Sequence, residues 1–365
     1  MKKEYGQHFL ADENILGVIG RLADLQPDDV VLEIGPGEGV LTRYLSARVK
    51  HVHAVEIDES LAPRLENLGD NVDVRFGDAL QLDLRTDANK LVANLPYNVA
   101  TPLLAESLDG LPAIELWCVM VQREVADRLF AQPGTKAYGA VSVLVQLATE
   151  RTGFHPVSRT VFRPPPNVDS ALVAFKRRGT LPPGVKRVVT AAFAHRRKTL
   201  PNSLELSGVA TRTEAAAALQ VLRRDGNTRA ESLAPHELVV VAETLRIREL
   251  IPGAEVRLTG SASVAGFPAE DLDLVVLVDE PRELPYPPLH RGQWRDDWRA
   301  YRLPGSPQVD IVLTRPGTLA HAHHVRAWER IADDPALLAE YRALDRTPEQ
   351  KRAFFDRVVD TFWNE

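Results

Sequence analysis

The sequence predicts an α/β protein: a mostly parallel sheet covered by helices on both faces, followed by a small helical domain and then an α+β domain. Its 365 residues exceed the roughly 250 to 300 at which one hydrophobic core usually stops growing. Short β-branched runs alternate with longer amphipathic ones up to about residue 175. Beyond Pro182-Pro183-Gly184 the alternation stops, and residues 185–245 have the pattern of short helices.

The elements of the first part follow in order along the chain. Strands are expected at 30–34, 52–57, 72–76 and 90–94, with helical segments at 41–48 and 60–67 between them. Further strands are expected at 116–122, 153–157 and 170–177, and a new strand-rich unit begins near residue 247. These patterns predict three domains, at residues 1–180, 181–246 and 247–365.

Composition is that of an ordinary soluble globular protein, with 44% hydrophobic and 26% charged residues. The single cysteine, Cys118, excludes a disulfide within the chain and fits a reducing compartment. The first residues contain no apolar signal core, and no apolar stretch approaches the ~18 residues of a membrane span. We therefore expect a cytoplasmic protein, monomeric and without a membrane partner.

Charge is divided unevenly along the chain, although the net charge is only −6. Residues 176–229 carry twelve Lys or Arg against three acids, whereas residues 248–365 lean acidic. A basic segment within an acidic chain indicates a polyanionic partner for one domain. The other interpretation, a solvated helical surface, stays open on charge alone.

A glycine-rich loop, Glu33-Ile34-Gly35-Pro36-Gly37-Glu38-Gly39, follows the first strand. Glycines let the backbone approach a ligand, and the next helix points amides at it. A dinucleotide site usually reads G-x-G-x-x-G, whereas this loop reads G-x-G-x-G. Glu33 and Glu38 would repel a pyrophosphate, so a cationic or neutral ligand fits better.

Acidic residues stand at the ends of the second and third strands. Glu56 can accept both hydroxyls of a ribose, and Asp78 can accept from an exocyclic amine such as adenine N6. Each acid alone is more typical of a turn. Ligands of open α/β sheets bind at the carboxyl ends of the strands, so the loop and both acids together predict S-adenosylmethionine.

The fourth strand ends in Asn94-Leu95-Pro96-Tyr97, which is suited to a methyl acceptor. The amine of adenine is a poor nucleophile because its lone pair is delocalised into the ring. Asn94 and the backbone carbonyls of Leu95 or Pro96 can accept its protons and localise that lone pair. Tyr97 offers a face for stacking the base, at ~1–3 kcal/mol. The alternative is a proline turn followed by a buried tyrosine.

Together these motifs resemble the ribosomal RNA adenine N6,N6-dimethyltransferase family of the KsgA type. The matching segments are 6–10, 33–37, 55–58, 77–80, 94–98, 120–126, 162–172 and 196–200. The resemblance implies a Rossmann-like class I methyltransferase fold, without a metal, that dimethylates two adjacent adenines near the 3′ end of small-subunit ribosomal RNA. It implies a cofactor site formed by His8, Leu10, Gly35, Gly37, Glu56, Ile57, Asp78, Ala79 and Asn94. Tyr97 and Phe162 would sandwich the adenine, and Arg123, Arg196, Arg197 and Lys198 would bind RNA.

Two alternatives remain at this point. The erythromycin-resistance type of methyltransferase shares fold and cofactor but modifies a large-subunit adenine, and Thr101-Pro102 favours the KsgA type. A non-catalytic RNA-binding or assembly factor is disfavoured by the intact catalytic motif. One departure bears on RNA binding, because Pro201 stands where the family usually has Arg. This removes a cation and is expected to end a helix early.

The last domain, residues 247–365, resembles the nucleotidyltransferase superfold and its GrpB-like branch. Its features are a Gly260-Ser261 turn, then Asp271 and Asp273 on one strand, then Asp310 on a later strand. Strand alternation puts Asp271 and Asp273 on one face, where with Asp310 they could hold Mg²⁺. Since Glu270 stands where that branch often has Lys, and no basic group is obvious nearby, we expect converging carboxylates with weak or absent transferase activity.

Overall fold

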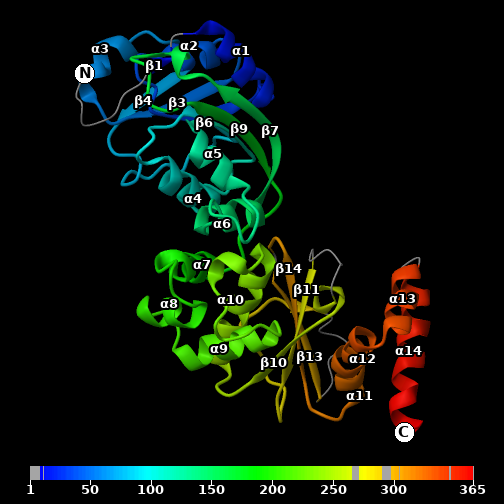
Figure 1. The fold of residues 1–365 in the computed structure, drawn as a ribbon. Helices are drawn as coiled ribbons and strands as arrows, with labels where there is room; N and C mark the ends of the chain where they lie inside the picture. The colour runs from blue at the N-terminus through cyan, green and yellow to red at the C-terminus, as the bar shows by residue number, and fades with distance from the viewer. Residues whose placement is uncertain are drawn as a thin grey trace. The chain divides into compact units, whose positions relative to one another are not determined.

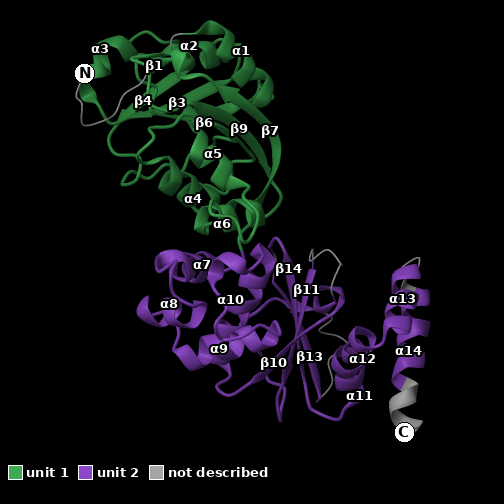
Figure 2. Cartoon of the chain, viewed as in Figure 1, with its two compact units in different colours: residues 1–181 green, residues 182–365 purple. Residues whose placement is uncertain are grey.

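The computed structural model describes residues 9–10, 12–264, 271–289, 297–303, 305–344 and 347–364. The chain forms two compact units, residues 1–181 and 182–365 (Figure 1, Figure 2). None of the helices in these described ranges is both long and apolar enough to cross a membrane.

Unit 1 is built on a seven-stranded sheet. Its strands, in spatial order, are β4 (Val72–Phe76), β3 (His51–Glu56), β2 (Val30–Ile34), β5 (Lys90–Asn94), β6 (Leu116–Gln122), β9 (Ser170–Arg177) and β7 (Thr149–Val157). The first five are parallel, and β9 runs antiparallel to both of its neighbours. Every residue of β2 is buried, as expected for a central strand covered on both faces. The predicted mostly parallel sheet is confirmed.

Helices cover both faces of this sheet (Figure 1). They are α1 (Glu13–Leu22), α2 (Val40–Ser46), α3 (Ala62–Leu65), α4 (Ala100–Gly110), α5 (Arg123–Leu129) and α6 (Ala140–Ala148). Asp12 caps α1 by accepting from the Asn14 amide, and Ile19 of that helix is buried in the core beside the sheet. The helix predicted at 60–67 is shorter, a 3₁₀ turn (Glu59–Leu61) followed by α3, because Glu66 already adopts extended backbone.

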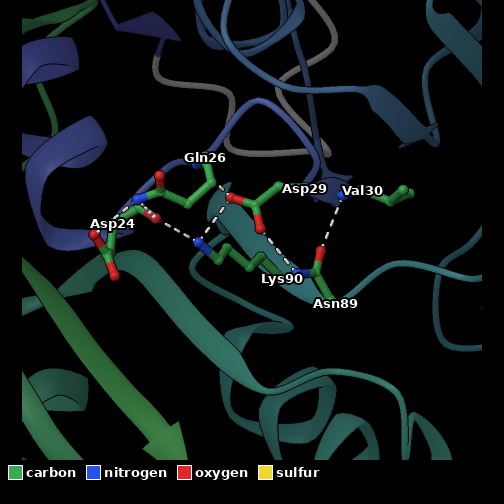
Figure 3. Close-up of polar contacts among 6 residues, drawn as sticks. All are labelled: Asp24, Gln26, Asp29, Val30, Asn89 and Lys90. Carbon is green, nitrogen blue, oxygen red and sulfur yellow. Dashed lines mark hydrogen bonds and ion pairs between the residues drawn. The ribbon is translucent and has the colours of Figure 1, made fainter.

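A buried polar network joins β2 to β5 at the start of both strands (Figure 3). The Lys90 ammonium lies 2.7 Å from the Asp29 carboxylate, and both side chains are less than a tenth exposed. Asn89 donates to Asp29 at 2.8 Å and accepts from the Val30 amide at 2.9 Å, while the Gln26 amide donates to Asp29 at 2.6 Å. The two central strands are thereby fixed at one end, and their carboxyl ends are left for a ligand.

A small two-stranded sheet also belongs to unit 1. Strand β1 (Phe9–Leu10) pairs antiparallel with β8 (Phe162–Arg163), so that Leu10 lies opposite Phe162. This pairing ties the segment that begins the described chain to the loop preceding β9.

Unit 2 begins with four helices, α7 (Val185–Ala194), α8 (Leu200–Leu206), α9 (Arg212–Val221) and α10 (Pro235–Leu250). Pro201 stands in the first turn of α8, so the prediction that it ends a helix is wrong. A proline is well accommodated there, because an amide in the first turn has no partner within the helix. Helix α10 also continues past the boundary expected at residue 246.

A five-stranded sheet follows in unit 2. Its order is β10 (Glu255–Thr259), β11 (Asp271–Leu277), β14 (Gln308–Thr314), β13 (Trp298–Leu303) and β12 (Pro288–Leu289). Only β11 and β14 are parallel to each other. The chain then enters α11 (Leu319–His321), a π-helical turn (Ala322–Arg326), α12 (Ala327–Asp333), α13 (Pro335–Ala343) and α14 (Pro348–Asn364). The mixed sheet followed by helices is the α+β arrangement that the sequence predicts.

Candidate active site

A cavity of about 130 Å³ lies at the carboxyl ends of β2, β3, β4 and β5. Strands β3 and β4 are added on one side of β2, and β5 and β6 are added on the other side. Open α/β sheets bind ligands at the point where the order of strand addition reverses, which here lies between β2 and β5. The predicted cofactor residues that line the cavity are Leu10, Gly35, Gly37, Glu56, Ile57, Asp78, Ala79 and Asn94. His8 lies outside the described residues.

The glycine loop after β2 has a backbone that few other residues could adopt. Gly35 and Gly37 have φ values of 76° and 59°, and a Cβ on Gly37 would approach the Phe9 ring to 2.9 Å. The Gly37 amide donates to Glu56 at 3.0 Å, and the Asp58 amide donates to the other oxygen of Glu56 at 2.9 Å. Glu56 therefore holds the loops after β2 and β3 together at the edge of the cavity.

Negative charge dominates the lining of this cavity. It contains Glu33, Glu38, Glu56 and Asp78, and no Lys, Arg or His among the described residues that form it. Glu38 also pairs with Arg64. These acidic side chains disfavour a pyrophosphate and favour a cation. S-adenosylmethionine carries a sulfonium and an ammonium group, so the donor set fits this cofactor.

Glu33 is the most deeply placed of these acids, with only 1% of its surface exposed. Burial raises its pKa to about 8, the Thr42 hydroxyl partly offsets the increase, and the neighbouring Glu56 carboxylate adds to it. A carboxyl group in this state is largely protonated at neutral pH. It becomes a strong acceptor once a cationic ligand lies beside it.

Apolar groups border the same cavity. Ile57 and Leu80 are large hydrophobic side chains that each remain 42% exposed at its rim. They offer apolar faces of the kind that a purine ring requires. Sequence reasoning did not single out Leu80, although it directly follows Asp78 and Ala79 in the third loop.

The predicted acceptor residues form another wall of the cavity. Asn94, Leu95, Pro96 and Tyr97 all line it. The Pro96 ring packs against the glycine loop, 3.3 Å from where a Cβ on Gly35 would lie. Thus the acceptor segment and the cofactor loop are in direct contact.

Tyr97 is held by a residue of β9 at the same edge of the sheet. Its hydroxyl forms a 2.6 Å hydrogen bond with the Ser170 hydroxyl at the start of β9, and burial raises its pKa. The bond fixes the ring at the cavity wall, where one of its faces could meet a base.

Phe162, which is predicted to sandwich the adenine with Tyr97, is buried in this structure. It is 1% exposed, belongs to the hydrophobic core that contains Leu10 and Val157, and does not line the cavity. The cause is the β1–β8 pairing, which sets Phe162 opposite Leu10. In this arrangement its ring does not face Tyr97 across the cavity, and a stacking role for Phe162 stays a prediction.

The predicted RNA-binding cations occupy two places. Arg123 begins α5, pairs with Asp127 at 2.9 Å and lies over the Phe154 ring. The basic turn, Arg196, Arg197 and Lys198, is exposed between α7 and α8, and Arg196 lies 3.6 Å from Glu231. Exposed cations of this kind are available to phosphates.

The three aspartates predicted to hold Mg²⁺ lie on β11 and β14, the two parallel strands of the unit 2 sheet. Asp271 and Asp273 are on β11, and Asp273 pairs in register with Asp310 on β14. Burial raises the pKa of Asp273 to about 6, with Asp310 and Asp271 adding to the increase. A Cβ on Gly260 would lie only 1.9 Å from an oxygen of Asp273, so the glycine turn makes room for this carboxylate.

A basic group does stand beside these acids, contrary to the sequence expectation. Arg302 donates to both oxygens of Asp310, at 2.7 and 2.6 Å. It belongs to β13 and faces Asp310 through the antiparallel β13–β14 register. Sequence reasoning missed it because the pairing depends on strand register, which spacing along the chain does not disclose.

The strand order of unit 1, the single antiparallel strand β9 and the acid-lined cavity define a Rossmann-like methyltransferase fold. The sequence model of one family, described as ribosomal RNA adenine dimethylase, matches residues 1–245. The chain belongs to this family, and the class of enzyme predicted from its motifs, an S-adenosylmethionine-dependent adenine methyltransferase, is confirmed. Residues 246–365 lie outside the match.

Individual relatives agree with this assignment. A Rubrobacter xylanophilus protein described as ribosomal RNA small subunit methyltransferase A is 45% identical over 249 residues, covering 66% of this chain and 93% of the relative. A Lactiplantibacillus plantarum protein of the same description is 44% identical over 272 residues, covering 69% and 92%. A dimethyladenosine transferase structure from Plasmodium falciparum has a TM-score of 0.57 at 23% identity, covers 66% of this chain and 98% of its own, and shows the same fold.

Proposed function

We propose that residues 1–245 transfer methyl groups from S-adenosylmethionine to N6 of two adjacent adenines near the 3′ end of small-subunit ribosomal RNA. The observation that carries this proposal is a single cavity with two walls. The charged side chains of the predicted cofactor wall are all acidic among the described residues, and the Asn94-Leu95-Pro96-Tyr97 segment forms the other wall. The small-subunit target is supported by the descriptions of the two bacterial relatives. A ribosomal substrate would place the protein in the cytoplasm.

Chemically, the acceptor segment activates and aims the adenine amine. When bound, the cofactor supplies an electrophilic methyl group on a positively charged sulfur. Asn94 and the carbonyls of Leu95 or Pro96 accept hydrogen bonds from the amine and direct its lone pair toward that methyl group. Tyr97, fixed by Ser170, stacks on the ring and limits its orientation. Each transfer forms one N–C bond, breaks one S–C bond and releases one proton from the amine.

A transfer assay tests the proposal directly. Labelled cofactor is incubated with small and with large ribosomal subunits that lack adenine methylation, using the wild-type chain and Asn94→Ala. We expect labelling of the small subunit only, and its loss in the variant while cofactor binding persists. Labelling of the large subunit would favour the erythromycin-resistance type. RNA binding without transfer in the wild type would favour an assembly factor, and normal turnover by the variant would contradict the role of Asn94.

We infer a division of labour among three domains: residues 1–180 for methyl transfer, residues 181–246 for RNA binding through the basic turn, and residues 247–365 as a GrpB-like accessory domain. Two hydrogen bonds from Arg302 already neutralise Asp310, and this disfavours Mg²⁺ held jointly by Asp271, Asp273 and Asp310. We therefore expect weak or absent nucleotidyl transfer. Incubating the full chain with labelled nucleoside triphosphates and magnesium checks this, and transfer that disappears in Asp271→Ala would contradict it.

A further inference from the structure

Two histidines and two aspartates gather in unit 1 away from the cofactor cavity. His51 and His53 are two residues apart on β3, so both side chains project from the same face of the sheet. Asp73 lies opposite His53 on β4, which is the edge strand. Asp87 belongs to the loop that precedes β5. None of the four lines the cavity described above.

The four side chains contact one another in pairs. His51 Nε2 lies 3.0 Å from Asp73 Oδ2, and His53 Nε2 lies 3.0 Å from Asp87 Oδ1. The two imidazole rings meet edge to face, with centroids 4.5 Å apart. Solvent reaches the group, since the histidine side chains are 27% and 20% exposed and the aspartates are more open.

Three of these side chains are spaced as metal ligands. One ligand atom each from His51, His53 and Asp73 lies within 4.8 Å of the other two. Within the part of the chain that the structure describes, these are the only three or more His, Cys, Asp or Glu residues so arranged. We propose that His51, His53 and Asp73 bind one divalent transition-metal ion of the zinc class.

Coordination geometry supports this choice of ion. Zinc bonds of roughly 2.0–2.1 Å to imidazole nitrogen and carboxylate oxygen, in a tetrahedron, separate the ligand atoms by about 3.3 Å. The His51–Asp73 pair, at 3.0 Å, has to open by only a few tenths of an ångström. Two imidazoles select zinc-class ions over Mg²⁺ and Ca²⁺, which prefer oxygen ligands alone. Water would complete the shell on the exposed side.

Asp87 acts as a positioning residue for this site. It accepts a hydrogen bond from His53 and so orients the imidazole ring, as carboxylates behind metal-bound histidines do. The bound ion would cross-link β3 to the edge strand β4. Because β4 leads directly to Gly77 and Asp78 at the cofactor cavity, the ion would stabilise the strand that presents this acid.

Zinc titration of the tag-free full chain, stripped with chelator, tests the site. Competition against a chromophoric zinc indicator should give a stoichiometry of one. The melting temperature should rise by about 3 °C or more at zinc concentrations well above Kd. Magnesium and calcium should produce neither effect.

Variants locate the site. His51→Gln and His53→Gln should each lower zinc affinity by at least about a hundredfold and abolish the thermal shift, and Asp87→Asn by about tenfold. His155→Gln, a half-buried histidine on β7 of the same unit, is the matched control and should bind like wild type. Melting without zinc checks that every variant is folded. No zinc-dependent shift in the wild type, or a shift that survives both histidine substitutions, would overturn the proposal.

Discussion

We predict that the buried carboxyl of Glu33 makes cofactor affinity depend on pH. Its pKa of about 8 in the free protein means that about 1% of it is ionised at pH 6 and about half at pH 8. A cationic ligand beside Glu33 favours the ionised form, so binding expels its proton. If only the ionised form binds, affinity for S-adenosylmethionine should rise up to about fiftyfold between pH 6 and pH 8. Glu33→Gln has no such proton to lose and should flatten this rise.

Calorimetric titration in two buffers of different ionisation enthalpy measures the proton directly. At pH 7 the wild type should release close to one more proton per cofactor bound than Glu33→Gln does. Comparing the two proteins cancels titration of the ligand's own groups. Equal proton release by both proteins, or parallel pH profiles of affinity, would refute the prediction that the Glu33 carboxylate balances the positive charge of the cofactor.

Three further predictions concern RNA binding and stability. Replacing the basic turn by alanines should weaken RNA binding and flatten the slope of log K against log salt by about 2–3, measured by fluorescence anisotropy; an unchanged slope would make the turn a solvated surface. Lys90→Ala leaves the Asp29 carboxylate buried without its ion pair and should cost about 3–5 kcal/mol in urea unfolding, and a cost below about 1 kcal/mol would contradict this. For Asp273, whose pKa is raised to about 6, stability should fall as pH rises from about 4 through 6. Asp273→Asn should therefore unfold at a higher temperature than wild type at pH 8 but not at pH 4, and equal differences at both pH values would contradict it.

Strands and local motifs of unit 1 could be predicted because their signals lie within a few consecutive residues. Central parallel strands covered on both faces have mostly apolar sequences, as β2, β5 and β6 do, whereas the edge strand β4 alternates apolar and polar residues. All four strands match the predicted ranges. The ligand loops follow those strands directly, so their gathering at one edge of the sheet also follows from the order of elements. Register across strands has no comparable signal. Phe162 is buried through its pairing with Leu10, and neither burial nor partner can be read from the motif that contains it.

Pro201 illustrates a different reason for failure. The same residue ends a helix when it stands in the interior and suits a helix when it stands in the first turn. Its effect therefore depends on where the helix begins, and α8 begins at Leu200. The sequence indicates that a helix begins or ends near this proline, but it does not show which of the two occurs.

The acidic residues of the cofactor cavity and those of the unit 2 sheet differ in how their negative charge is balanced. At the cofactor cavity, Glu56 already accepts hydrogen bonds from two backbone amides. Glu33 is buried in the same wall, which contains no basic side chain among the described residues, so a proton or a cationic ligand is needed to offset its charge. In the sheet of unit 2, the negative charge of Asp310, which lies beside Asp273, is already balanced by Arg302 through two hydrogen bonds. A metal there would have to displace a charge-assisted bidentate pair, whereas a sulfonium in the cavity displaces nothing but a proton. This difference is why we assign cofactor chemistry to the first group of acids and an accessory role to the domain that carries the second.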